Sequence, residues 1–164
     1  MINAPILANE PERLEALQKI GILDTPPEDR FDQITKEAIK LLKVPISTIS
    51  IIDKDREWFK SCQGVTKNWS DRSVSFCGHA LASKDIFIIE DTLNDERFKD
   101  NPAVVGPPFI RFYAGLSLYS ENSLPIGVFC IKDFQPRRVS LAEIDLILKL
   151  GAMAQMEINN SVKK

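Results

Sequence analysis

The sequence has 164 residues, 44% of them hydrophobic, with 21 basic and 23 acidic side chains. This length suits a single domain, and the hydrophobic fraction excludes extensive disorder. Because the charges nearly balance and are interspersed, they exclude a basic nucleic-acid-binding or membrane-surface protein, and we expect neither nucleic acid nor membrane as a partner. We interpret residues 1–164 as one domain with its core over about residues 9–156.

The longest hydrophobic runs have the length of strands and are too short to cross a bilayer. The first residues lack the basic start and hydrophobic stretch of a secretory signal. Three cysteines, Cys62, Cys77 and Cys130, form no CxxC spacing, which favours reduced thiols over a disulfide framework. Together these features predict a cytoplasmic protein.

Two helices are predicted in the first part of the chain. The first opens at Asn9–Glu12, where a capping residue, a proline and a glutamate stand in the order typical of a helix start, and Gly21 ends it. The second opens at Thr25–Glu28, which repeats this signal. Its hydrophobic side chains share one face at helical spacing, and these are Phe31, Ile34, Ala38 and Leu41.

The pattern then changes to short runs that favour strands, rich in β-branched and aromatic residues and separated by turn residues. The last two strands are separated by a loop that contains Asn122 and Pro125, so they form a hairpin. The predicted strands are Val44–Asp53, Glu57–Cys62, Ile86–Glu90, Phe112–Tyr119 and Ile126–Lys132.

The middle of the chain is less regular. Ser75–Leu81 fits a short helix, and Asp91–Pro108 is a polar excursion with one helical turn near Asp95–Lys99. A long polar insertion inside a compact domain is more often functional than idle, so we expect this excursion to cover a site.

The final helix opens at Ser140–Glu143 and extends to about Met156 or beyond. Its hydrophobic residues occupy more than one face, which indicates deep burial or cover by a second chain. The element order predicts an α+β fold: a mostly antiparallel sheet of five or six strands, with the terminal helices on one face and short helices and loops over the other.

An ordered series of short motifs resembles the GAF domain family, in particular the amino-terminal GAF domains of bacterial sensor histidine kinases and diguanylate cyclases. Each motif is weak alone, but the ordered series covers nearly the whole chain. The motifs are Asn9–Glu10, Arg13–Leu14, Ala16–Leu17, Ile22–Pro26, Val44–Ile46, Arg56–Lys60, Ser75–Ala80, Asp95–Phe98, Asp100–Pro102, Ile110–Gly115 and Pro136–Arg137.

The resemblance implies a ligand pocket on one face of the sheet and a homodimer surface of terminal helices on the other. It implies a non-catalytic sensory or regulatory role in bacterial signal transduction, including two-component systems, with an output partner such as a kinase or cyclase. The family often has Gly-Thr/Ser-Leu-Cys in the last strand, where this chain has Gly127–Cys130. The bulkier Phe129 is therefore expected to narrow the pocket.

Period-two alternation in the strand after Ile110 points Phe112 and Ala114 to one face and Tyr113 and Ser117 to the other. The second set is polar and suits a binding face, or else a solvent-facing side with Arg111 paired to an aspartate. The expected ligand-binding residues are Phe76, Cys77, His79, Asp91, Asn101, Arg111, Tyr113, Ser117 and Phe129.

Catalytic and cofactor roles are weaker alternatives. Cys77 and His79 are too few for a closed zinc site, and the motifs of chromophore attachment and cyclic-nucleotide binding are absent. Two further alternatives stay open: a thiol-dependent reductase of the free methionine sulfoxide type that uses Cys77 and Cys130, and a pure interaction domain with an empty pocket. We expect no metal, no cofactor and no catalytic residue, but an unidentified small ligand.

Overall fold

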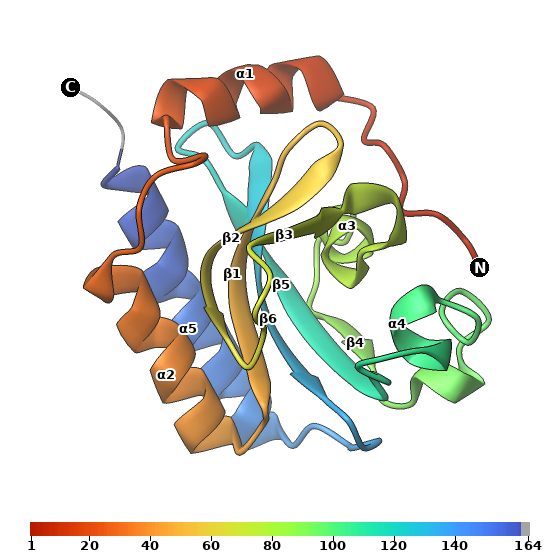
Figure 1. Cartoon of the computed structure of the whole chain (residues 1–164). Coiled ribbons are helices and arrows are strands. Elements are labelled where there is room, and N and C mark those ends of the chain that lie inside the picture. Colours follow the sequence, from red (N-terminus) through yellow and green to blue (C-terminus); the bar gives the residue numbers. More distant parts are fainter. Residues whose placement is uncertain (162–164) are drawn as a thin grey trace.

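The computed structural model, in which residues 1–161 are described, is built around one antiparallel sheet with the strand order β3-β2-β1-β6-β5-β4. Helices cover both faces of this sheet (Figure 1). The strands are β1 Ile46–Ile52, β2 Arg56–Gln63, β3 Trp69–Asp71, β4 Phe87–Ile89, β5 Phe112–Tyr119 and β6 Pro125–Asp133. The α-helices are α1 Glu10–Ile20, α2 Asp29–Leu42, α3 Phe76–Leu81, α4 Pro102–Val105 and α5 Leu141–Asn159, and η1 Arg72–Val74 and η2 Thr92–Asn94 are short 3₁₀ helices.

The predicted α+β fold and the five predicted strands are confirmed, and β3 is an addition. It pairs with β2 and forms the edge of the sheet, through Trp58↔Trp69 and two neighbouring positions. Its three residues are only partly buried or exposed, so they carry no hydrophobic run that a sequence pattern could detect.

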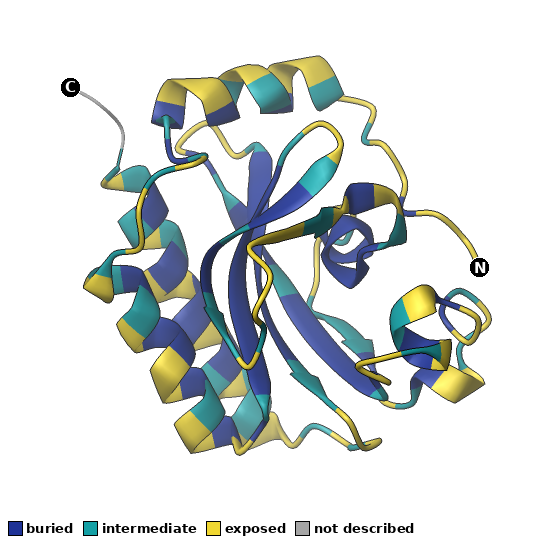
Figure 2. Ribbon diagram, viewed as in Figure 1, coloured by how far each residue is buried: buried dark blue, intermediate teal, exposed yellow. Residues whose placement is uncertain are grey.

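The α2 and α5 helices form one layer against the sheet, and their inward sides are buried (Figures 1 and 2). The α5 helix begins after Ser140, as predicted, and the structure shows a capping box between Ser140 and Glu143. The α2 face differs from the prediction in one position: Leu42 is buried, whereas Leu41 is 50% exposed. The prediction for Leu41 is wrong because, in the last helical turn, Leu42 is the residue that faces the sheet.

The α1 helix lies across the ends of the strands rather than on the α2–α5 face (Figure 1). Its Arg13 side chain is fully buried and donates to the Ile52 carbonyl at 2.6 Å and to both carboxylate oxygens of Glu10 at 2.7 and 3.0 Å. Arg72 reaches the same carboxylate from η1 at 2.5 Å. One carboxylate thus joins two buried guanidinium groups and anchors α1 to the sheet.

Glu10 makes folding stability depend on pH. Burial alone would raise the pKa of Glu10, but the hydrogen bonds from Arg13 and Arg72 outweigh it and lower this pKa to about 2 from 4.5. Because the folded-state pKa is depressed, the stabilisation is fully present above pH 4.5 and is lost as pH falls toward 2, to a total of about 3 kcal/mol. Urea titrations at several pH values would show a steeper acid loss for the parent chain than for Glu10→Gln. Equal slopes would contradict the assignment.

A second hydrophobic layer fills the other face, between the sheet and the segment from α3 to α4. Phe76 stacks between Phe98 and Tyr113, with ring centroids 4.7 and 5.3 Å away. The predicted Ser75–Leu81 helix is confirmed as α3, with the Ser75 hydroxyl accepting from the Gly78 amide. The predicted turn near Asp95–Lys99 is present as a hydrogen bond from the Lys99 amide to the Asp95 carbonyl.

Across residues 1–161, no helix is long and apolar enough to span a bilayer.

Candidate functional site

A cavity of about 260 Å³ lies on this second face, between the sheet, the β2–β3 connection and the α4 segment. Its walls are mainly hydrophobic, with a few polar groups, as is usual for small-molecule sites. The hydrophobic walls include Ile46, Phe59, Val65, Trp69, Phe76, Ala103, Pro108 and Ile110. The polar lining consists of Glu57, Lys67, Ser70, Ser75, Asn101 and Lys132.

Glu57 is the buried carboxylate of this cavity, with 2% of the residue exposed. Its two oxygens accept hydrogen bonds from the Ser50 hydroxyl at 2.7 Å and the Ser70 hydroxyl at 3.1 Å. Among residues 1–161, no basic side chain lies within ion-pair distance of this carboxylate. A carboxylate held by neutral donors keeps acceptor capacity for a further donor.

Lys132 supplies a cation to the same cavity from the end of β6. Its ammonium lies 5.7 Å from the Phe76 ring centroid and 6.0 Å from that of Tyr113. Burial alone would lower the pKa of Lys132, but the Coulombic attraction of the acidic groups around it, Glu57 among them, outweighs it and raises this pKa. Within the described part of the chain, the ammonium makes neither an ion pair nor a hydrogen bond.

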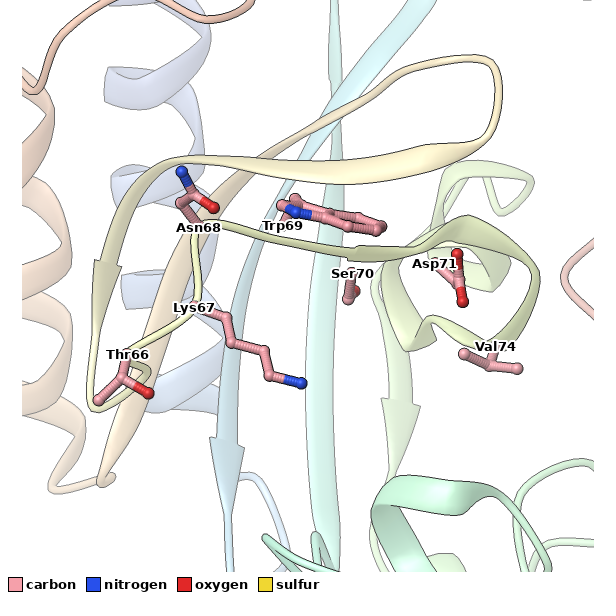
Figure 3. A pocket seen from close by; sticks show the side chains of 7 residues that line it. All are labelled: Thr66, Lys67, Asn68, Trp69, Ser70, Asp71 and Val74. Atoms are coloured by element: carbon pink, nitrogen blue, oxygen red, sulfur yellow. The ribbon is translucent and has the colours of Figure 1, made fainter.

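The mouth of the cavity continues into a broad open hollow along the β2–β3 connection. The cavity and this hollow share Lys67, Trp69, Ser70 and Val74. Figure 3 shows the Lys67 and Ser70 side chains on one side of this segment and the Trp69 indole on the other. Trp69 is 49% exposed, so the rim of the cavity carries a hydrophobic side chain beside the cationic Lys67.

The predicted site residues fall into separate groups, and only Phe76 and Asn101 line the cavity. Asn101 caps α4 by accepting from the Ala103 amide at 2.9 Å, and its amide nitrogen donates to the Val74 carbonyl at 2.9 Å. This residue therefore fixes the α4 wall relative to η1.

The face of Tyr113 and Ser117 is closed by protein side chains. Tyr113 is fully buried and its hydroxyl donates to the Cys77 sulfur at 3.0 Å, while Ser117 donates to the Ala80 carbonyl at 2.8 Å. The alternation predicted for β5 is correct, but α3 packs directly on the polar set. The expectation of open space there is wrong, and the cavity lies farther toward β2.

Three further predicted residues contact backbone groups of the protein through their side chains: His79, Asp91 and Arg111. His79 contacts the Ile2 carbonyl at 3.0 Å, and burial lowers its pKa. Asp91 caps η2 by accepting from the Leu93 amide at 3.1 Å. Arg111 donates to the Val104 carbonyl at 2.9 Å and so supports the end of α4.

Phe129 lies on the opposite face from the cavity, in the core beneath α2 and α5, and is fully buried. The prediction that it narrows the pocket is therefore wrong. Its neighbours Val128 and Cys130 face α3 instead, because side chains alternate along β6.

Glu57 and Lys132 were not among the predicted site residues. Each lies next to a strand residue that faces the opposite side of the sheet. These neighbours, Trp58 and Ile131, belong to the core beneath α2 and α5. A charged residue alternating with core residues on a strand was the signal available in the sequence.

Comparisons with known proteins agree on the domain type. The model of the GAF domain family matches residues 26–158. A cyclic di-GMP phosphodiesterase of Pseudomonas aeruginosa is 36% identical over 148 residues, which cover 90% of this chain and 25% of that protein. The chain thus spans about a quarter of the length of this curated relative.

Solved structures show the same fold at low sequence identity. The GAF domain of a Coxiella burnetii phosphoenolpyruvate-protein phosphotransferase superposes with a TM-score of 0.68 at 15% identity, covering 94% of this chain and 96% of that one. A free methionine-R-sulfoxide reductase of Neisseria meningitidis superposes with a TM-score of 0.64 at 13% identity, covering 99% and 96%. These likenesses show the fold alone.

Proposed function

The chain belongs to the GAF domain family, and we propose that it is a regulatory domain whose cavity on the α3–α4 face binds a small ligand. The observation that carries the proposal is the cavity itself, whose lining includes both Glu57 and Lys132. Its volume of about 260 Å³ suits a metabolite. Ligand occupancy would bias the position of the surrounding elements and so reach an output partner such as a kinase or cyclase.

A thermal-shift screen of the purified chain with nucleotides, amino acids and other metabolites tests ligand binding. We expect at least one compound to raise the melting temperature. Ala103→Leu, which fills part of the cavity, should abolish this shift, whereas Ala82→Leu places the same group on an exposed position outside it. No shift with any compound, or equal shifts in both variants, would contradict a ligand-binding role at this cavity.

We propose further that the domain forms a homodimer through α5. This helix carries an exposed hydrophobic stripe of Leu141, Leu148 and Met156, which are 85%, 45% and 63% exposed. These positions, with Ala152 between the last two, share one helical face. Exposed hydrophobic stripes of this kind are typical of interaction surfaces.

Leu148→Glu should weaken this dimer because it introduces a charge at the middle of the stripe. We expect the dissociation constant to rise at least about 30-fold, or roughly 2 kcal/mol. Sedimentation equilibrium measures it, with Leu93→Glu as a control at a comparably exposed leucine on the opposite layer. A parent chain that stays monomeric at high concentration would refute the dimer.

We propose a non-catalytic role for the cysteines. Cys77 and Cys130 are fully buried, and burial raises the pKa of the Cys77 thiol, so it is a poor nucleophile. Free thiols at Cys62, Cys77 and Cys130 also suit a reducing cytoplasm. Reduction of free methionine sulfoxide by the purified chain, lost in Cys77→Ser, would establish the reductase instead.

A further inference from the structure

Two opposite charges face the cavity without contacting each other. No ion pair joins the Glu57 carboxylate to the Lys132 ammonium among residues 1–161, although both line one cavity of about 260 Å³. Glu57 is 2% exposed, and a charge that is shielded from water is costly unless it is paired, whereas Lys132 is partly buried. An occupant with one positive and one negative group would compensate both charges at once.

Hydroxyl groups donate hydrogen bonds to both oxygens of the Glu57 carboxylate. Ser50 donates to the carboxylate, so the Ser50 oxygen is free to accept from the Thr48 hydroxyl at 2.9 Å. Thr48, having donated, accepts from the Cys130 thiol at 3.0 Å. These contacts form a relay of donors that all point toward Glu57, and Ser70 adds a second donor. The lone pairs that these donors leave free on the carboxylate suit an external ammonium.

The ammonium of Lys132 is positioned by aromatic rings rather than by an acceptor. Phe76 and Tyr113 lie on one side of it at cation–π distances. An aromatic ring is not a conventional hydrogen-bond acceptor, so the three N–H donors of the Lys132 ammonium remain available. An external carboxylate is the group that would satisfy them.

The strand register sets the separation of the two charges. Lys132 pairs with Ile46, and the Glu57 carboxylate is held by Ser50, four positions along β1. Four residues span about 13 Å of strand. The two side chains therefore reach the cavity of about 260 Å³ from different positions along β1, and no ion pair joins them among residues 1–161.

The charges around the cavity argue against a nucleotide. A phosphate near Lys132 would share the cavity with the buried Glu57 carboxylate, and like charges in a low-dielectric site repel strongly. A simple amine would satisfy Glu57 but would place a second cation beside Lys132. Only an occupant with both groups avoids both penalties.

We infer that the cavity takes a small zwitterion of the free amino acid class, with its ammonium at Glu57, its carboxylate at Lys132 and its side chain against the hydrophobic walls. This inference rests on the proposed ligand-binding function and names the chemical class of the ligand. The α4 segment, fixed to η1 by Asn101, would form the wall that contacts the amino acid side chain.

The first test compares ligand classes on the unmodified chain. Melting temperature is measured with each standard amino acid, with AMP and inorganic phosphate as anions and with putrescine as a cation. We expect a shift from one or more amino acids. For the strongest of these, calorimetry should show that the analogue lacking the ammonium and the analogue lacking the carboxylate each bind about 10- to 100-fold more weakly. An analogue that binds as well as the amino acid would overturn the inference.

The second test uses charge-removing variants whose fold is checked by circular dichroism. Glu57→Gln and Lys132→Met should each weaken amino acid binding about tenfold or more. Lys84→Met makes the same change at an exposed lysine outside the cavity and should alter affinity less than about threefold. Unchanged affinity in the first two variants would overturn the inference.

The outcomes separate the ligand class from the ligand-binding function. If AMP, phosphate or putrescine shifts the melting temperature and no amino acid does, the zwitterion inference fails while the cavity remains a ligand site. If no compound of any class produces a shift, both proposals fail together.

Discussion

Replacement of Arg13 by methionine is expected to lower the free energy of unfolding by about 3–5 kcal/mol, the range found when one partner of a buried ion pair is removed. The Arg13 guanidinium is fully buried, so its loss leaves the Ile52 carbonyl without this donor in a site that water does not reach. Glu10 keeps its contact with Arg72, but it loses the partner on its own helix.

Chemical denaturation of the parent chain and the variant measures this loss, with the m-value as a check that unfolding stays two-state. Lys19→Met is the matched control on the same helix, because Lys19 is 72% exposed and pairs with the exposed Glu15. Its effect should stay within about 0.5 kcal/mol. A similarly small effect at Arg13 would mean that α1 contributes little to the stability of the domain.

The secondary structure of this chain follows largely from local signals in the sequence. Capping residues such as Ser140 and Glu143 satisfy backbone groups at one helix end, and period-two alternation along β5 orients Phe112 and Tyr113 to opposite faces. These signals act within a few residues, so a single sequence carries them. The one strand without a pattern, β3, exists because the edge of β2 offers a partner.

The candidate site was harder to predict because it depends on which segment packs on each face. The alternation in β5 correctly separates two faces, but it cannot tell an open polar face from one that α3 covers. Glu57 and Lys132 come from strands that are not neighbours in the sheet, and only the register with β1 brings them to one cavity. Such a site is a tertiary property.

The β1 strand also explains how the cavity could communicate with the helical layer. Thr48 and Ser50 face the cavity side through the relay to Glu57, whereas Ile49 and Ile51 pack in the core beneath α2 and α5. A shift of β1 along the sheet normal therefore moves both layers together, since packed cores deform little. Ligand occupancy and the α5 surface are coupled through this strand in our proposal.

Gly115→Ala is expected to destabilise the domain by about 2–3 kcal/mol through overpacking. The Tyr113 ring lies over Gly115, and a Cβ atom there would come within 2.8 Å of two ring carbons and closer still to the hydroxyl oxygen. Real Cβ contacts of this kind are not tolerated, so the ring has to move. Its displacement would break the hydrogen bond to Cys77 and disturb the stack with Phe76.

The double variant Gly115→Ala/Tyr113→Leu isolates this cause. Tyr113→Leu alone should be destabilising because it removes a fully buried ring, but adding Gly115→Ala to it should cost less than about 1 kcal/mol, since the clashing atoms are gone. Denaturation of all four proteins gives the coupling energy. Additive effects would show that the glycine is required for another reason. A strong coupling would show that the missing side chain at position 115 is what lets Tyr113 close this face, and so confines the ligand cavity to the β2 side.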